Sequence, residues 1–359
     1  MRVAIIGLAS RYWPAAFADR LLAVPEVELA GAAYCGRDDQ FITASLGSSK
    51  EAFAARYSIP LYADPKELIR EQRPEAVVIC EESIGQHRYV DLAAEAGVHC
   101  FIAKPMATTL EAADQMVSAV ERAGVVASTG STQRFDGALR QVWEQLRREE
   151  IGDIVSIRVM HQHGNIDAFG PDDWYRKPEN GGPELSLFWY VVDCLRWLTG
   201  KEIAGVYSQY DNFLWPQSPF FDNAKALVRF DDGTLGSIDA YFCMRWRYPS
   251  WEVEIVGSKG AIKTTQSNFE GTRYGPDGAG SFYRAQNDHL GAELRHWLGA
   301  CQGKWPPEVS LADARRTIEV SLACLQSAQT GQPVGLPLEA AEPIVAGRDK
   351  YTRGIGAHA

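Results

Sequence analysis

Val3-Ala4-Ile5-Ile6-Gly7-Leu8-Ala9-Ser10-Arg11-Tyr12-Trp13-Pro14 joins a short apolar strand to a glycine loop and a helix start. In a Rossmann fingerprint, three small residues let backbone amides and a helix N-terminus approach a dinucleotide pyrophosphate. Gly7 is the first, Ala9 stands at the second position and Tyr12 at the third. A plain buried strand and turn is the alternative. The residues expected at the cofactor are Gly7, Ala9, Ser10 and Arg11.

Strand and helix signals alternate through the first third of the chain. Strands separated by helices predict a parallel, doubly wound sheet. We therefore expect an α/β fold that begins with a Rossmann domain over residues 1–128. The expected strands after the first are Val27–Tyr34, Ala76–Cys80, Val98–Ile102 and Val125–Ser128. The expected helices are Pro14–Val24, Ser49–Tyr57, Pro65–Glu71, Tyr89–Ala96 and Leu110–Ala123.

The pattern changes after about residue 130, where longer strand candidates follow one another. Turn signals such as Asp231-Asp232-Gly233 separate them. This predicts a second, α+β domain over 129–359 with a large, mostly antiparallel open sheet. The expected strands are Ile154–His161, Val206–Phe213, Asn223–Phe230, Gly236–Phe242 and Trp251–Val256, with helices at Ala138–Glu149 and Ala312–Gln329.

Composition excludes several classes of protein. A net charge of -10 disfavours nucleic acid as a partner, because an acidic chain repels phosphate backbones. No stretch approaches 18 apolar residues, so no membrane span is expected. The seven scattered cysteines form no C-x-x-C pair, which predicts free thiols and a cytoplasmic location. His161 and His163 form no convincing ligand set, so we expect no metal.

The residues after the second strand bear on the choice of dinucleotide. An NAD enzyme usually places a carboxylate there for the ribose 2′-hydroxyl. Gly36 holds that place and Arg37 follows, and a guanidinium suits bidentate contact with a 2′-phosphate. Gly36 and Arg37 therefore favour NADP over NAD. In the alternative, Arg37 is solvated and Asp38 or Asp39 binds the ribose.

Two further candidates follow the ends of predicted parallel strands, where ligands bind in such sheets. Lys104, followed by Pro105, comes after Val98–Ile102 and could hold a substrate oxygen or the ribose. His87 comes after Ala76–Cys80 and could lie near the nicotinamide. The alternatives are a surface position for Lys104 and a helix-capping or surface role for His87.

The segment from Gly181 to Leu198 predicts an apolar helix opened by glycines. Ser186, Tyr190 and Asp193 fall at i, i+4 and i+7, on one helical face. Such a stripe must face partners or a ligand, because unpaired buried polar groups are costly. Tyr190 could exchange a proton with a substrate hydroxyl, helped by a cation that lowers a free pKa near 10. A structural hydrogen-bond network is the alternative.

The chain resembles the glucose–fructose oxidoreductase / inositol dehydrogenase family (Gfo/Idh/MocA). Ala103-Lys104-Pro105 is similar to its Glu-Lys-Pro motif, and Gly181 to Asp193 is similar to its glycine-opened helix. The resemblance covers almost the whole chain. Further matching pieces are Gln133-Arg134-Phe135, Trp174-Tyr175-Arg176, Phe221-Asp222-Asn223, Gly257-Ser258-Lys259-Gly260 and the end from Glu308 to Pro337.

The resemblance implies a Rossmann domain, NADP or NAD as cofactor, and a homodimer or homotetramer formed through the open C-terminal sheet. It implies Lys104 and Tyr190 as the catalytic pair, with tyrosine typical of the branch that contains glucose–fructose oxidoreductase. The residues expected at the substrate are Asp193, Ser186, Trp174, Arg176 and His163.

The resulting expectation is hydride transfer between a nicotinamide and a carbinol or carbonyl carbon of a sugar, sugar derivative or cyclitol. Two alternative functions are also compatible with the sequence. Some relatives are NAD-dependent glycosidases that oxidise their substrate only transiently. A non-catalytic dinucleotide or metabolite sensor would explain the altered glycine loop and Ala103 and Ser186, which stand where the family has carboxylates.

Overall fold

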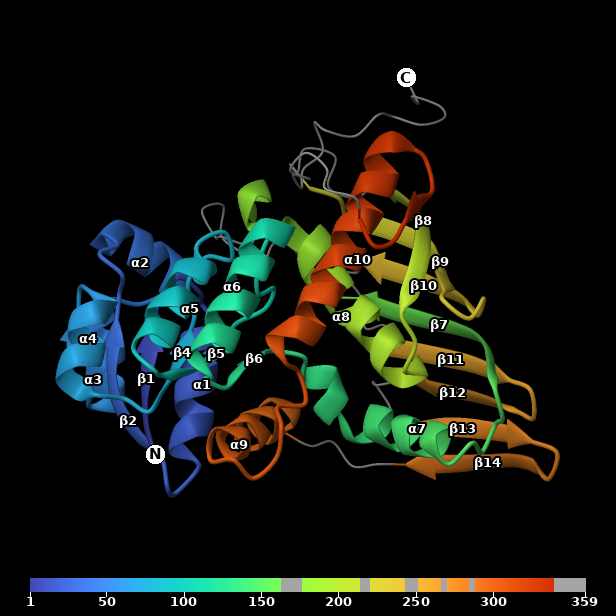
Figure 1. Ribbon diagram of the computed structural model, residues 1–359, viewed down its shortest axis with the longest axis horizontal. Coiled ribbons are helices and arrows are strands. Elements are labelled where there is room, and N and C mark those ends of the chain that lie inside the picture. The colour runs from blue at the N-terminus through green and yellow to red at the C-terminus, as the bar shows by residue number, and fades with distance from the viewer. Residues whose placement is uncertain (163–175, 214–219, 243–250, 266–269, 284–287, 339–359) are drawn as a thin grey trace. The chain divides into compact units, whose positions relative to one another are not determined.

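The computed structural model describes residues 1–162, 176–213, 220–242, 251–265, 270–283 and 288–338 (Figure 1). The chain forms two compact units, each described here by itself. The first comprises Met1–Gly130, Phe169–Asn180 and Leu290–Ile318. The second comprises Ser131–Ala168, Gly181–His289 and Glu319–Ala359. The predicted boundary after residue 128 lies next to the break between Gly130 and Ser131.

The first unit contains a six-stranded sheet in the order β3-β2-β1-β4-β5-β6, in which every neighbouring pair is parallel. This confirms the predicted doubly wound sheet. All side chains of β4 are buried, because helices cover both faces of such a sheet. The strands are β1 (Arg2–Ile6), β2 (Glu28–Ala33), β3 (Leu61–Tyr62), β4 (Ala76–Ile79), β5 (His99–Ile102) and β6 (Ala127–Thr129).

Helices of the first unit begin and end at residues that suit those positions. For α6, the Thr109 side chain accepts the amide of Ala112 and Gly124 ends the helix at φ 65°. Helix α9, late in the chain, packs on β5 through a contact between Phe101 and Trp297. The helices are α1 (Trp13–Leu22), α2 (Asp39–Leu46), α3 (Lys50–Tyr57), α4 (Pro65–Gln72), α5 (Gln86–Glu95), α6 (Leu110–Ala123) and α9 (His289–Cys301).

The second unit contains a nine-stranded sheet in the order β14-β13-β12-β11-β7-β10-β9-β8-β15. Only β7 and β10 pair in parallel among these described strands, so the predicted mostly antiparallel sheet is confirmed. The strands are β7 (Ile154–Gln162), β8 (Ile203–Asp211), β9 (Asn223–Phe230), β10 (Leu235–Tyr241), β11 (Trp251–Gly257), β12 (Ala261–Thr265), β13 (Glu270–Gly275), β14 (Gly278–Tyr283) and β15 (Val334–Gly335).

One face of this sheet is covered by α8 (Gly182–Thr199), which packs against β7 and β10 (Figure 1). Buried and exposed residues alternate strictly along β9, as expected for a strand with one covered face. Two other helices belong to this unit at least in part. Helix α7 (Gly137–Arg147) lies beside α8, and α10 (Leu311–Thr330) begins in the first unit and ends in the second.

The opposite face of the sheet carries both charged and apolar side chains. Lys225 and Arg158 each pair with Asp239, which links β9, β10 and β7. Leu227, Leu235 and Val256 remain 64%, 50% and 43% exposed.

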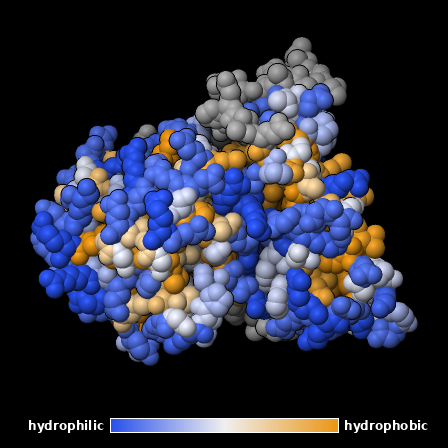
Figure 2. Space-filling model, in the orientation of Figure 1, coloured by the Kyte–Doolittle hydropathy of each residue, from blue (hydrophilic) through white to orange (hydrophobic). Residues whose placement is uncertain are grey.

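Most of the molecular face in Figure 2 is hydrophilic, with hydrophobic residues in scattered groups.

The described residues bear on two of the expectations from composition, the absence of a membrane span and the free thiols. None of their helices combines the length and apolar character that crossing a bilayer requires. Six of the seven cysteines lie in the described part of the chain, and all six are free thiols.

Candidate active site

The loop after β1 lies in close contact with the end of β4. Gly7 has φ +92°, and a Cβ at this position would lie 2.7 Å from the amide nitrogen of Glu81. Only glycine fits there, because a side chain would meet rigid backbone and a strained φ. The Ala9 amide donates to the Cys80 carbonyl over 3.2 Å, which fixes the loop to β4.

The loop ends at α1, where some backbone amides have no acceptor among the described residues. The Ser10 hydroxyl accepts hydrogen bonds from the amides of Tyr12 and Trp13, both at 3.2 Å. The amides of Ser10 and Arg11 donate to no other described residue. The Arg11 side chain is exposed and reaches the Ala44 carbonyl at 3.4 Å. Open amides ahead of a helix N-terminus suit a pyrophosphate, so these residues fit a dinucleotide.

The Arg37 guanidinium is already held by two carboxylates. Its Nη2 lies 2.8 Å from Glu81 Oε1 and 2.7 Å from Glu82 Oε2, and the group stacks over Phe41 at 4.4 Å. Gly36, at φ +67°, has open space around it. Glu81 and Glu82 were not among the predicted site residues, although two acidic residues directly after a buried parallel strand could have indicated the cofactor edge of the sheet.

Neither aspartate of the alternative ribose site is free. The Asp38 carboxylate accepts the Phe41 amide over 2.7 Å and caps α2. Asp39 pairs with Lys50. Carboxylate oxygen is available instead at Glu81, whose side chain is 1% exposed and whose Oε2 has no hydrogen-bond partner among the described residues.

Glu82 connects this edge of the sheet to a segment near the middle of the chain. Its Oε1 accepts Lys177 Nζ at 3.0 Å and Asn180 Nδ2 at 3.1 Å. Asn180 in turn accepts the Ile84 amide at 3.3 Å. The ion pairs of Arg37, Glu81, Glu82 and Lys177 balance one another, so the cluster has no net charge.

Lys104 follows β5 and is buried, with 5% of its surface exposed. Burial lowers the pKa of its amine to about 7, because a low-dielectric environment disfavours the ammonium. The nitrogen lies 5.9 Å from the centre of the Trp13 ring. The neighbouring Pro105 carbonyl accepts Gln86 Nε2 at 2.9 Å. In the described structure, Nδ1 of His87 is buried and has no hydrogen-bond partner.

Tyr190, on α8, lies in an aromatic cluster between this helix and the sheet of the second unit. Its ring centre is 5.6 Å from that of His161 and 6.2 Å from that of Trp251, which lie opposite each other on β7 and β11. His161 stacks on Trp251 at 4.1 Å. Tyr190 is 7% exposed and Ser186, one turn earlier, is fully buried. Trp251 was not among the predicted site residues.

Asp193 belongs to a buried hydrogen-bond network. Its carboxylate accepts Arg134 Nε at 3.0 Å and Nη2 at 2.5 Å, and it also accepts the Ser131 hydroxyl. Arg134 lies in the 3₁₀ turn η1 (Thr132–Phe135). Asp193 is fully buried and has these donors, as the alternative of a structural hydrogen-bond network predicts, and its contact with substrate stays a prediction.

Three predicted substrate residues lie at or near the edge of the described structure. Trp174 and His163 fall outside the described residues. Arg176 is half-buried just before the 3₁₀ turn η4 (Pro178–Asn180), and its role stays a prediction. The described residues contain no group of three or more His, Cys, Asp or Glu arranged to hold a metal ion.

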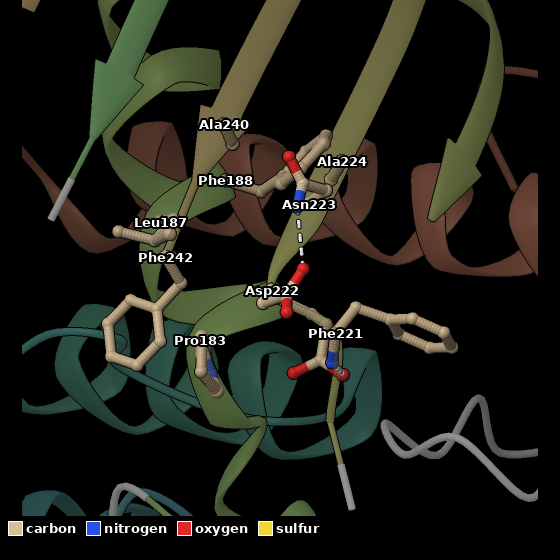
Figure 3. A pocket seen from close by; sticks show the side chains of 10 residues that line it. Pro183, Leu187, Phe188, Phe221, Asp222, Asn223, Ala224, Ala240 and Phe242 are labelled. Carbon is tan, nitrogen blue, oxygen red and sulfur yellow. Dashed lines mark hydrogen bonds between the residues drawn. The ribbon is translucent and has the colours of Figure 1, made fainter. Parts of the chain in front are cut away.

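A narrow pocket at the start of α8 contains a buried acid that the sequence did not single out. It encloses about 10 Å³, which is space for one water and too little for a sugar. Glu184 Oε1 accepts the Phe221 amide at 3.0 Å, and Oε2 has no partner among the described residues. Burial raises the pKa of Glu184 to about 8. Figure 3 shows the surrounding side chains, including Pro183, Leu187, Phe188, Ala224, Ala240 and Phe242.

Comparison with known families covers both units. Residues 1–131 match the model of an oxidoreductase family with an NAD-binding Rossmann fold, and residues 139–263 match the model of the GFO/IDH/MocA C-terminal domain. The chain belongs to the Gfo/Idh/MocA family. The predicted family membership and the predicted NAD(P)-dependent oxidoreductase are therefore confirmed, in preference to the glycosidase and sensor alternatives.

Individual members of the Gfo/Idh/MocA family are similar over most of the chain. Myo-inositol 2-dehydrogenase of Thermotoga maritima is 26% identical, over 77% of this chain and 84% of the relative. D-apiose dehydrogenase of Paraburkholderia graminis is 27% identical, over 79% of each. The crystal structure of an Agrobacterium radiobacter oxidoreductase, in complex with NAD+, L-tartaric acid and magnesium, has a TM-score of 0.78 at 18% identity, over 93% of this chain and 98% of that one.

Proposed function

We propose that this family member transfers a hydride between a nicotinamide and a carbinol or carbonyl carbon of a sugar, sugar derivative or cyclitol. The similarity to a cyclitol dehydrogenase and a sugar dehydrogenase supports this substrate class. A bound nicotinamide dinucleotide supplies the hydride chemistry. The chain's own residues bind the substrate, exclude water and move the hydroxyl proton.

The buried amine of Lys104 is the observation that carries the proposal. Lys104 lies at the carboxyl end of a parallel strand and is 5% exposed. Burial lowers the pKa of its amine to about 7. A group whose charge changes near neutral pH suits proton chemistry. Its ammonium form would hold the substrate oxygen and stabilise a phenolate.

Tyr190 is proposed to receive the hydroxyl proton of the substrate on oxidation, and to return it on reduction. Its packing against His161 and Trp251 restricts the ring to one orientation. Asp193 acts through its neighbours in this proposal. It holds α8 to the turn that contains Arg134, and therefore positions Tyr190, one turn away on the helix.

The choice between NAD and NADP depends on Arg37. Its position after the second strand is the reason why NADP was predicted. A 2′-phosphate would need this guanidinium, yet Glu81 and Glu82 already share one of its nitrogens. We therefore expect NAD(H) to be preferred, with a ribose 2′-hydroxyl donating to Glu81 Oε2, the buried oxygen that has no hydrogen-bond partner among the described residues.

A homodimer or homotetramer built through the open sheet stays part of the proposal. Leu227, Leu235 and Val256 lie on the sheet face opposite α8 and are about half exposed or more. Burying such apolar surface against a second copy would stabilise an assembly. Light scattering of the purified protein measures the number of copies.

Replacing each proposed catalytic residue tests the function. Lys104→Met and Tyr190→Phe should each lower kcat by orders of magnitude on a responsive polyol, with little change in melting temperature. Lys66→Met and Tyr274→Phe, at exposed positions, serve as matched controls and should keep full activity. Near-normal turnover in both catalytic variants, or no nicotinamide-dependent turnover by the wild-type protein across a broad panel of sugars and cyclitols, would reject the proposal.

A further inference from the structure

A second pocket lies in the first unit, between the turn before β2, helix α9 and the turn that follows α9. It encloses about 190 Å³. One water takes up roughly 30 Å³ in the liquid, so the pocket has room for a small organic molecule with a single ring. The lining residues that matter here are Glu26, Arg295, Gly299, Gln302, Lys304 and Trp305.

This pocket is distinct from the proposed dinucleotide site. Glu26 precedes β2, so the pocket lies at the edge of the sheet where that strand begins. Gly7, Glu81 and Lys104 follow the ends of β1, β4 and β5, at the other edge, because all these strands are parallel. A strand of this length separates the two edges by roughly 15 Å.

Trp305 forms a fixed aromatic wall of the pocket. Its Nε1 donates to the His296 carbonyl over 2.8 Å, and its ring stacks on the His296 ring at 5.4 Å. A Cβ at Gly299 would lie 2.3 Å from the indole, so glycine is required beneath it. Even so, 44% of Trp305 is exposed. A single exposed apolar residue is common on protein surfaces, but an immobilised indole beside an open pocket provides a platform for a ring.

The charged groups around Trp305 have no partners among the residues that the structure describes. In the described part of the chain, neither Arg295 nor Lys304 forms an ion pair or a side-chain hydrogen bond. The same is true of the Glu26 carboxylate and the Gln302 amide. The lining therefore carries two positive charges and one negative charge, in a chain whose net charge is -10. A local positive excess of this kind attracts an anion.

We propose that this pocket binds an anionic monosaccharide, with a carboxylate or a phosphate as its acid group. The apolar face of the sugar ring packs on Trp305, and the acid group lies between Arg295 and Lys304. Glu26 and Gln302 provide acceptors and donors for the ring hydroxyls. The volume fits one sugar ring better than a nucleotide, since pockets for larger ligands usually exceed about 300 Å³.

Fluorine NMR of the full-length protein labelled with 5-fluorotryptophan tests the proposal at Trp305 itself. The Trp305→Phe variant identifies the Trp305 resonance by its disappearance. D-glucuronate and D-glucose 6-phosphate are the two anionic probes, and D-glucose and AMP are the neutral-sugar and nucleotide comparisons. No dinucleotide is added, so the result is independent of the proposed dehydrogenase activity.

The Trp305 resonance should shift saturably with one or both anionic sugars, and the probe that binds more tightly identifies the acid group. Arg295→Gln and Lys304→Gln should each weaken binding about tenfold, as expected for a lost charge-assisted hydrogen bond. Arg70→Gln, which removes an exposed cation whose described partner is the adjacent Glu71, is the matched control and should bind like wild type. No saturable shift with either anion, an equal response to D-glucose, a response to AMP alone, or unchanged binding in both pocket variants would overturn the proposal.

Discussion

Arg134 forms a two-point ion pair with Asp193 inside the second unit, and the two side chains are 7% and 0% exposed. The pair joins η1 to the middle of α8, three residues beyond Tyr190. A planar guanidinium that binds both oxygens of a carboxylate fixes orientation as well as distance. The position of the proposed proton-transfer group therefore depends on an arginine that the sequence analysis noted only as part of a matching motif.

Breaking this pair should destabilise the protein strongly. Arg134→Met leaves the Asp193 carboxylate buried without its ion-pair partner, and we expect a loss of about 3–5 kcal/mol in the free energy of unfolding. Arg134→Lys keeps the charge but loses the fork, so its loss should be smaller. Chemical denaturation of the three proteins measures the difference. If Arg134→Met unfolds like wild type while KM rises sharply, Asp193 contacts the substrate directly, as the sequence predicted.

The low pKa of Lys104 predicts a pH dependence of the reaction. The amine is protonated below a pKa of about 7 and neutral above it. Because the proposed role needs the ammonium, kcat/KM should fall as the pH rises through this value. In Lys104→Arg, the guanidinium stays charged, so the residual activity should not fall over the same range. A wild-type rate that instead rises through pH 7 would mean that the neutral amine is the base.

Glu184 predicts a pH dependence of stability. Burial raises its folded-state pKa from 4.5 to about 8. Between these values the folded protein holds a proton that the unfolded chain has released, so stability falls as the pH rises, by at most about 1.4 kcal/mol per pH unit. Glu184→Gln keeps an acceptor for the Phe221 amide and removes the titration.

The stability of Glu184→Gln relative to wild type should therefore increase from pH 5 to pH 8. Melting temperatures measured at several pH values across this range compare the two proteins. Glu95→Gln, at an exposed position of α5, is the matched control and should follow wild type. The same pH dependence in Glu184→Gln and wild type would mean that this acid stays ionised in the folded protein.

The ion pairs of Arg37 predict cofactor selectivity. In Glu81→Gln, one of the two charges that occupy the guanidinium is removed, so NADP should bind more tightly and the preference for NAD should decrease about tenfold or more. Calorimetric binding of NAD and NADP to the protein without substrate measures this directly. A wild-type protein that already prefers NADP would show that Arg37 leaves its carboxylates when the dinucleotide binds.

Local signals determine how much of the fold could be predicted. Helix α6 was predicted at its observed bounds, because Thr109 and Gly124 cap it at both ends. Strands β13 and β14 were missed, since their glycines weaken the strand pattern and pairing with each other supplies the missing preference. Helix α9 was missed as well. It contains Gly291 and Gly299, and its packing against β5 outweighs their low helix propensity.

Only those site residues could be predicted whose place in a single strand or helix is visible in the sequence. Lys104 and Tyr190 stand out because a strand end and a helical stripe are visible in the sequence. The pairings that control neighbouring groups are not visible there. Arg37 and Glu81 are 44 residues apart, and Arg134 and Asp193 are 59 apart. Contacts of this kind arise from tertiary packing, which no local pattern specifies.

The segment Leu290–Ile318 completes the first unit, and this has a consequence for how the protein is made. Trp297 packs on Phe101, and the Val309 carbonyl accepts the Ser128 hydroxyl. During translation, the nascent Rossmann sheet leaves the ribosome long before either partner has been synthesised. Until then Phe101 has its contact with Phe17 but lacks its contact with Trp297. A fragment that stops at residue 130 would never gain the second contact, so the apolar surface that Trp297 covers would stay exposed and prone to aggregation.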